Sequence, residues 1–372
     1  MHIVISTGPN LPVPAVRGGA VHRFWSQMAP AFARHGHRVT VCARAHPPQP
    51  SAETIDGVRY RRSGGFDASS SKLRDYARSL LWALVSTVKL PDGDVYVSND
   101  LFSPWLLAAK GRAPRTLVAV GRAPKGQFRF YPRGLTLAVP THAIAENVSR
   151  EAPHLRARCR VLPYAIDTDC FCPSADPTCD IGNKMLFAGR IHPEKGLDLL
   201  IQAFRQIARR KPATRLTIVG PSAVDQGGAG EKYCADLHAA SRDLPVEWLD
   251  PIYDTRALAS LYRSSSRFIY PSLSETGETF GVAALEAMAC GAIPVVSALG
   301  CFQDFIEHGR NGAIFDHRAR DPVEALVEAI EFAGGESAPQ LAEAATRTAL
   351  EYGLDAVADR WLVVLDQIAA VH

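Results

Sequence analysis

Between residues 271 and 291 the chain reads Pro271-Ser-Leu-Ser-Glu-Thr-Gly-Glu-Thr-Phe-Gly-Val-Ala-Ala-Leu-Glu-Ala-Met-Ala-Cys-Gly291. A short apolar run, residues 267–271, leads into this stretch, and helical spacing begins near Gly281. A second apolar run, residues 293–297, follows the helix. The order strand, loop, helix, strand is the repeating unit of parallel, doubly wound sheets. The stretch therefore predicts an α/β fold.

The same alternation extends in both directions along the 372 residues. One series of strand and helix signals starts at the N-terminus, and a second, complete series starts at residue 184. We expect two Rossmann-like doubly wound domains that face each other across a cleft. The predicted divisions are an N-terminal domain at 1–165, a Pro-rich linker at 166–183, a second domain at 184–353 and a C-terminal helix at 354–372 that packs back on the first domain.

Composition excludes several classes of protein. With 47% hydrophobic and 21% charged residues the chain has enough apolar surface to fold, which excludes disorder. No apolar run approaches the ~18–20 residues of a membrane span, and the longest, residues 80–88, ends at Lys89. The first residues indicate a strand and not a signal peptide. The eight cysteines lack the paired spacing of a metal site, so we expect free thiols and no metal.

Charge is distributed unevenly between the two halves. Residues 1–180 hold 23 Lys and Arg against 13 Asp and Glu, a balance of +10, whereas residues 181–372 hold 18 against 25, a balance of −7. A basic N-terminal half favours contact with an anionic membrane surface or an acidic acceptor, and a solvated surface explains it equally well. Nucleic acid is not expected, because the half lacks a basic helix with interleaved aromatic residues.

Two carboxylates flank the start of the predicted helix at 281. Glu278 precedes it and Glu286 lies eight positions later in an otherwise apolar segment. The backbone amides of Phe280, Gly281 and Val282 are candidate donors to a phosphate or a sugar hydroxyl, as at other helix N-termini. Carboxylates accept from hydroxyls and repel phosphate, so the pattern predicts a ligand with both groups. A helix-dipole effect accounts for Glu278 alone.

Two further loops carry candidate phosphate-binding residues. Arg190 and Lys195 stand five apart in a strand-to-helix loop, where they could clamp a diphosphate, although a solvated loop with two ordinary cations gives the same spacing. The pair Gly18-Gly19 follows the first strand and lets the backbone approach a phosphate, a signal that is weak by itself.

Together these motifs resemble the retaining glycosyltransferases of family 4, which have the GT-B fold. The resemblance rests on four blocks in order along the chain: the Gly18-Gly19 loop, the GR…EKG…LI.AF block at 189–204, the E-x7-E pair Glu278 and Glu286, and a Gly-Arg-Asn-Gly loop at 309–312. It implies a hexosyltransferase that transfers a sugar from a nucleotide-sugar, with UDP-sugars favoured over GDP-mannose, in polysaccharide, glycolipid or small-molecule biosynthesis.

The resemblance also implies roles for single residues. Arg190 and Lys195 would neutralise the leaving diphosphate, Glu286 would accept from the ribose hydroxyls and Glu278 would lie near the donor sugar. The amides of residues 280–282 would bind sugar hydroxyls or phosphate, Gly18 and Gly19 would contact the phosphates, and the acceptor would bind the N-terminal domain. No cofactor or metal is implied, and the location would be cytoplasmic or peripheral at the inner face of a membrane.

One departure from the family pattern concerns the acceptor. The strand at 116–120 is followed by Gly-Arg-Ala-Pro-Lys, without the histidine that many members have there. Arg122 or Lys125 then becomes the candidate acceptor contact. Two alternatives keep the fold but change the function: a nucleotide-sugar epimerase, which needs no acceptor, and a non-catalytic nucleotide-sugar binding subunit.

Overall fold

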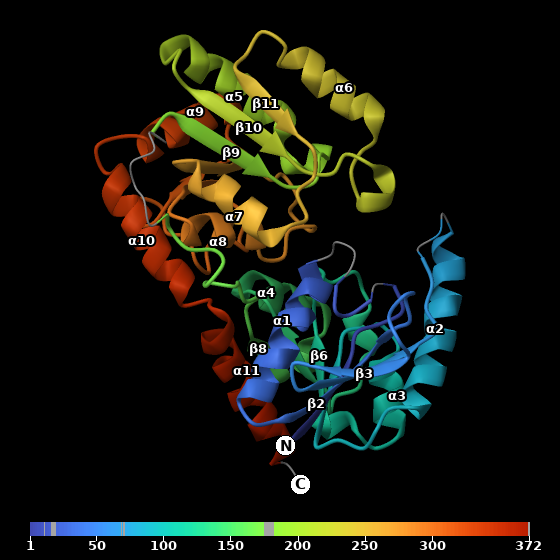
Figure 1. The fold of residues 1–372 in the computed structure, drawn as a ribbon. Helices are drawn as coiled ribbons and strands as arrows, with labels where there is room; N and C mark the ends of the chain where they lie inside the picture. The colour runs from blue at the N-terminus through green and yellow to red at the C-terminus, as the bar shows by residue number, and fades with distance from the viewer. Residues whose placement is uncertain (11, 16–19, 68, 70, 175–181, 371–372) are drawn as a thin grey trace. The chain divides into compact units, whose positions relative to one another are not determined.

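The computed structural model describes residues 1–10, 12–15, 20–67, 69, 71–174 and 182–370. The chain divides into two compact units (Figure 1). Unit 1 consists of Met1–Ala165 together with Leu354–His372, and unit 2 consists of Ile166–Gly353. Each is built on its own sheet, as the alternation of strand and helix signals predicts.

Unit 1 contains an eight-stranded sheet in the order β3-β4-β2-β1-β5-β6-β7-β8. All neighbouring strands are parallel except β3 and β4, which form an antiparallel pair at one edge. Central strands such as β1 and β5 are buried throughout, as expected where helices cover both faces. The strands are β1 (His2–Ser6), β2 (Arg38–Arg44), β3 (Ala52–Ile55), β4 (Val58–Ser63), β5 (Val95–Ser98), β6 (Thr116–Ala119), β7 (Thr136–Val139) and β8 (Cys159–Val161).

The helices of unit 1 come from both of its chain segments. They are α1 (Ala20–Arg34), α2 (Lys72–Val88), α3 (Ser103–Ala109), α4 (His142–Glu151) and α11 (Leu354–Ala369), with 3-10 turns at Ala113–Arg115, Phe128–Phe130 and Pro153–Arg158. The C-terminal α11 lies beside α1 (Figure 1), where the Trp361 ring meets the Trp25 ring edge-on at 5.3 Å. Buried aromatic area of this kind is a large source of packing energy.

Unit 2 contains a six-stranded, wholly parallel sheet in the order β11-β10-β9-β12-β13-β14. Its strands are β9 (Lys184–Ala188), β10 (Arg215–Val219), β11 (Val246–Leu249), β12 (Arg267–Tyr270), β13 (Ile293–Ser297) and β14 (Ala313–Phe315). Its helices are α5 (Leu197–Arg210), α6 (Glu231–Ala240), α7 (Thr255–Arg263), α8 (Val282–Ala289), α9 (Pro322–Ala333) and α10 (Ala338–Leu350), with 3-10 turns at Pro193–Lys195 and Val224–Gln226.

The segment expected as a linker lies against unit 2 as far as Ser174, after which residues 175–181 fall outside the described chain. Arg263 at the end of α7 donates to the carbonyl oxygens of Cys170 and Cys172, at 2.5 and 2.7 Å. Phe171 is 2% exposed. This part of the chain is therefore fastened by buried contacts, which its Pro-rich composition does not reveal.

Candidate functional site

The candidate site of unit 2 lies where the strand order reverses. β9 is flanked by β10 on one side and by β12 on the other, so the loops that follow β9 and β12 leave the same sheet edge side by side. Ligands of open α/β sheets bind at such a switch point, outside the carboxyl ends of the strands. The two loops are residues 189–196 and 271–281, which contain most of the residues singled out from the sequence.

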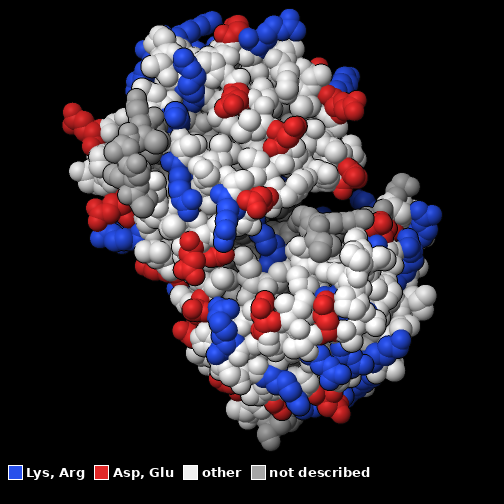
Figure 2. All heavy atoms as spheres, viewed as in Figure 1, with Lys and Arg blue, Asp and Glu red and all other residues white. Residues whose placement is uncertain are grey.

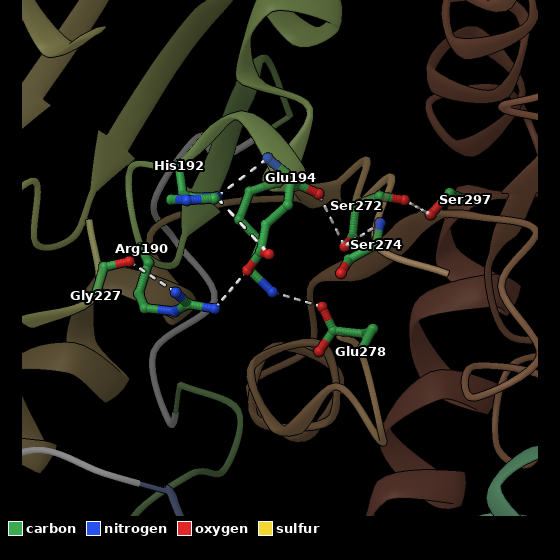
Figure 3. Close-up of polar contacts among 9 residues, drawn as sticks. Arg190, His192, Glu194, Gly227, Ser272, Ser274, Glu278 and Ser297 are labelled. Carbon is green, nitrogen blue, oxygen red and sulfur yellow. Dashed lines mark hydrogen bonds and ion pairs between the residues drawn. The ribbon is translucent and has the colours of Figure 1, made fainter. Parts of the chain in front are cut away.

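Hydrogen bonds fasten the two loops to each other (Figure 3). The carbonyl oxygen of Glu194 accepts from the backbone amide of Leu273 at 2.8 Å and from the hydroxyl of Ser272 at 3.3 Å. The Ser297 hydroxyl, at the end of β13, donates to the carbonyl of Ser272 at 2.5 Å. Three neighbouring strand ends are thereby joined, which holds the loops in a fixed relation before any ligand binds.

Gly196 permits this close approach of the loops. Its φ is +71°, and a β-carbon at this position would lie 2.1 Å from the carbonyl oxygen of Pro271. Both the left-handed backbone and the contact exclude other residues. The glycine of the EKG block is therefore required by the backbone geometry of the site.

Arg190 follows β9 and points into the site (Figure 3). Its guanidinium donates to the carbonyl of Gly227 at 2.7 Å and to the Glu194 carboxylate at 2.5 Å. The side chain stays 41% exposed, so part of its donor fork faces solvent. A guanidinium held in this way can receive an anion without first being ordered.

Lys195 and Glu278 form a buried ion pair across the two loops. The lysine Nζ lies 2.6 Å from a Glu278 carboxylate oxygen, and their side chains are 6% and 11% exposed. The same Nζ lies 5.2 Å from the centre of the Tyr270 ring. Burial, followed by the Glu278 charge, holds the pKa of the Tyr270 hydroxyl well above its usual value. Because burial of charge is costly unless it is compensated, this pair needs both members.

Helix α8 begins beside Glu278 and contains the second carboxylate. Gly281 caps the helix in a left-handed conformation at φ +97°, and the first internal bonds run to its carbonyl oxygen from Ala284 and Leu285. The amides of Gly281 and Val282 thus precede these bonds, in the position expected for ligand donors. Phe280 is buried with its ring 5.2 Å from that of Phe305.

Glu286 is buried within α8 at 3% exposure. One of its carboxylate oxygens accepts from the hydroxyl of Tyr262, on α7, at 3.3 Å. Its partner thus comes from a neighbouring helix of the same unit. A carboxylate anchored in this way is a rigid acceptor, which suits recognition of hydroxyl groups.

The two cations of the unit 2 site are each paired with a carboxylate. Arg190 pairs with Glu194, and Lys195 pairs with Glu278. The local sequence pattern does not predict these pairings, because it indicates no partner for either cation. Glu194 belongs to the EKG block and Ser272 follows a strand end, so a local sequence pattern places both of them near the site. Gly227 comes from a separate loop, and no sequence pattern marks it as a site residue.

In unit 1, the predicted acceptor residues follow β6. Arg122 and Lys125 are both exposed, and the Lys125 amide donates to the Gln127 side chain at 2.7 Å. Gly18 and Gly19 lie outside the described residues, so the structure says nothing of them.

Beside Arg122, the strand ends of unit 1 border a pocket that is partly open to solvent. Aromatic side chains from α1, α11 and the end of the N-terminal segment dominate its lining, namely Phe24, Trp25, Tyr164 and Trp361. Asn99 crosses this region, accepting from Trp25 Nε1 and donating to the Ala119 carbonyl, both at 2.8 Å. The lining is therefore mostly apolar. The polar groups of Asn99 and Trp25 are already bonded, whereas the buried Trp361 Nε1 has no hydrogen-bond partner among the described residues.

His22 of α1 lies near this pocket. Burial, reinforced by the Arg122 charge, lowers the pKa of its imidazole to about 4. Its Nε2 is buried and meets no hydrogen-bond partner among the described residues. The ring is therefore neutral at pH 7.

Comparison with known families gives a partial match. Residues 180–348 match the family model described as "Glycosyl transferases group 1", which covers the unit 2 site but less than half of the chain. A D-inositol 3-phosphate glycosyltransferase of Frankia alni is 32% identical over 227 residues, which is 55% of this chain and 53% of that protein. The chain thus spans about half the length of the first curated relatives it matches.

Solved structures resemble the whole chain. Sucrose-phosphate synthase from Thermosynechococcus elongatus has a TM-score of 0.79 at 19% identity, covering 100% of both chains. The Anabaena protein HepE, solved with UDP-glucose, has a TM-score of 0.71 at 17% identity, covering 99% of this chain and 100% of its own. These likenesses confirm the predicted fold class, GT-B with two Rossmann-like α/β units.

Proposed function

We propose that the protein is a retaining glycosyltransferase that moves a sugar from a nucleotide diphosphate sugar to a glycan, lipid-linked or small-molecule acceptor. One observation supports this most directly. The segment that matches the glycosyltransferase family model, residues 180–348, contains both loops of the switch point, with Arg190 exposed at the rim and the Lys195–Glu278 pair beneath it.

The proposed chemistry uses the charges of that site. The bond between the anomeric carbon and the diphosphate oxygen breaks, and the acceptor oxygen bonds to the same face of the anomeric carbon. The acceptor proton passes to the leaving phosphate oxygen. Negative charge grows on the diphosphate, and Arg190 and Lys195 would stabilise it because they are positioned in advance. These cations take the place of a metal, so the reaction is proposed to be metal-independent.

The remaining residues are proposed to hold the donor. Glu286 would accept from the ribose hydroxyls, Glu278 would lie near the sugar, and the amides of residues 280–282 would donate to sugar hydroxyls or phosphate. Glu278 accepts a hydrogen bond from Lys195, so a sugar hydroxyl would share the carboxylate with the lysine. Gly18 and Gly19 would contact the phosphates, and Arg122 or Lys125 the acceptor.

A UDP-sugar is the favoured donor, with GDP-mannose next. The likeness to HepE, which was solved with UDP-glucose, supports uridine. We further propose that the enzyme acts in the cytoplasm, with peripheral contact at the inner face of a membrane through its basic N-terminal domain. The high share of Lys and Arg in residues 1–180 supports that contact.

Thermal unfolding with UDP and with GDP, each with and without Mg²⁺, tests the donor site. A ligand at a hundred times its dissociation constant adds about 2.7 kcal/mol to stability. We expect UDP to raise the melting temperature without Mg²⁺ and Glu286→Gln to weaken the shift, because glutamine still accepts from Tyr262 but loses the charge. Glu343→Gln, on the exposed surface of α10, is the matched control. A shift that needs Mg²⁺, or none with either nucleotide, would contradict the proposal.

Product analysis separates the alternatives. Incubation with UDP-glucose and a mixture of sugar acceptors should release UDP and give a new glycoside with the anomeric configuration of the donor. An epimerase would instead convert the nucleotide-sugar without an acceptor, and a binding subunit would show the thermal shift with neither product.

A further inference from the structure

Helix α2 of unit 1 has an inverted distribution of side chains. Seven of its large apolar residues are between 41% and 80% exposed, namely Leu73, Tyr76, Leu80, Leu81, Leu84, Val85 and Val88. The residues it buries are Trp82, Ala83, Ser86 and Thr87. Most surface helices place their leucines inward, and scattered exposed leucines are ordinary. Seven on one helix form a patch that needs an explanation.

The inward face is fastened by polar bonds. Trp82 Nε1 donates to the carbonyl of Ser63 at 3.3 Å, and the Thr87 carbonyl accepts from Lys110 at 3.0 Å. Ser71 caps the helix N-terminus by accepting from the Arg74 amide. The orientation of α2 is thus set by specific contacts, so the leucines cannot turn inward without breaking them.

Four exposed leucines and a valine form one continuous stripe, called here the leucine stripe. Leu73, Leu80, Leu84 and Val88 are separated by seven, four and four residues, the spacing of a single helical face, and Leu81 widens it. In Figure 1 α2 runs along the outer margin of unit 1, and Figure 2 shows uncharged surface there with basic groups beside it. No helix in the described part of the chain is long and apolar enough to cross a membrane.

Basic side chains flank this stripe on one side. The basic residues are Arg74, Arg78 and Lys89. Intervals of four and then eleven residues separate them, and this spacing places all three along one edge of the exposed face. Arg78 lies over the Phe66 ring at 4.2 Å, and Arg74 donates to the Ser69 hydroxyl at 3.3 Å. These contacts hold the two arginine side chains against the segment that precedes α2, while both residues remain exposed.

The acidic content of α2 is small and already bonded. Asp75 is its single carboxylate, and it accepts from both the amide and the hydroxyl of Ser69, at 2.8 and 2.7 Å. A second copy of the chain would bring the same positive flank and no free acidic partner on its own α2. The charge therefore favours a negatively charged occupant over self-association.

We propose that α2 docks unit 1 onto an anionic lipid surface, with the leucine stripe at the boundary between headgroups and acyl chains and the arginines on the headgroup phosphates. An apolar face with a basic flank on a helix too short to span is the pattern of interfacial helices. The inference concerns membrane binding alone and does not depend on glycosyl transfer.

Co-flotation with lipid vesicles tests the proposal on the full chain. The probes are vesicles of phosphatidylcholine and vesicles that also contain 30% phosphatidylglycerol. We expect the wild type to float with the anionic vesicles, with weaker binding at high salt. Leu81→Glu with Leu84→Glu should weaken binding about a hundredfold, since burial of each leucine contributes roughly tenfold. Arg74→Gln with Lys89→Gln should weaken it about tenfold or more and flatten the salt dependence.

The matched control is Val363→Glu, which places a charge at an equally exposed apolar position on α11, 58% exposed. It should bind vesicles as the wild type does. The circular dichroism spectrum should be unchanged in all variants, which shows that they fold. The shift in melting temperature caused by nucleotide should also be unchanged, which shows that the donor site is intact.

Three results would overturn the proposal: no flotation of the wild type with either vesicle, equal flotation of the double glutamate variant, or equal binding to neutral and anionic vesicles. The alternative outcome is a concentration-dependent dimer that Leu81→Glu with Leu84→Glu dissociates, without any vesicle binding. That result would show that a second copy of the chain covers the leucine stripe.

Discussion

The carboxyl edges of the two sheets are built alike but carry opposite chemistry. In unit 2 the edge is an array of paired charges, with Arg190 bonded to Glu194 and Lys195 to Glu278. In unit 1 the corresponding edge is an aromatic-lined pocket, and its histidine is kept neutral. The same strand-loop-helix frame thus supports a polar site and an apolar one. The loops, and not the sheets, determine what each edge can bind.

The largest effect should come from breaking the charge pairing in unit 2. Lys195→Met leaves the Glu278 carboxylate buried without its cation, and loss of one member of such a pair costs about 3–5 kcal/mol. Urea unfolding measures the change. Adding Glu278→Gln to the same chain should recover much of the stability, while Lys232→Met on the exposed surface of α6 should have little effect. Full stability in Lys195→Met would show that the pair is not desolvated.

Removal of a polar side chain at the unit 1 edge should lower the free energy of unfolding somewhat less than breaking the charge pair does. Asn99→Ala removes the acceptor of Trp25 Nε1 and the donor to the Ala119 carbonyl, so two groups lose their partners. We expect a loss of about 2–3 kcal/mol in urea unfolding and an unchanged UDP-induced thermal shift. A weaker UDP-induced shift in melting temperature would show that the two sheet edges are coupled.

Acidification should lower the folding stability through His22, which lies at the sheet edge of unit 1. The His22 pKa of about 4 lies below the ordinary 6.5, so between these pH values the unfolded chain binds a proton that the folded chain refuses. This group should therefore contribute its full share of stability above pH 6.5, and that share should fall by about 3 kcal/mol as the pH drops toward 4. His22→Gln should remove that part of the slope in unfolding measurements made at several pH values. An identical slope in the variant would place the loss elsewhere.

The smallest effect should come from the support beneath Arg190. Gly227→Ala forces a side chain onto a backbone with φ of +84° and places its β-carbon 3.0 Å from the Arg190 Cδ. A left-handed non-glycine residue costs about 1–2 kcal/mol. The displaced guanidinium should also weaken UDP binding by titration calorimetry. Gly111→Ala, at φ of +72° but with open space around it, separates backbone strain from the contact.

The sequence is most informative where residues close together in the chain act together. The switch-point loops, the start of α8 and the strand–helix alternation follow from local patterns at 189–204 and 267–297. The pairing of Lys195 with Glu278 does not, because 83 residues separate the two and no local rule connects them. Gly227 is hidden for the same reason, since its partner Arg190 lies 37 residues earlier.

Parts of unit 1 escaped prediction for a different reason. Strand β4, which lies between the edge strand β3 and β2, alternates buried and exposed positions, but Arg59, Arg61 and Arg62 give it the composition of a loop. The apolar run at 80–88 was noted as too short to span a membrane and was not assigned to a helix. Its leucines lie on the solvent side, so the usual inward periodicity is absent.

Unit 1 is completed by a segment made long after the rest of it. The first 165 residues leave the ribosome without α11, and the 188 residues of unit 2 follow before Leu354 is added. At synthesis rates of about 5–20 residues per second, this delay is roughly 10 to 40 seconds. During that time the Trp25 and Phe24 rings have no Trp361 to cover them. Until α11 is synthesised, the nascent unit 1 therefore lacks part of the cover over these two aromatic rings.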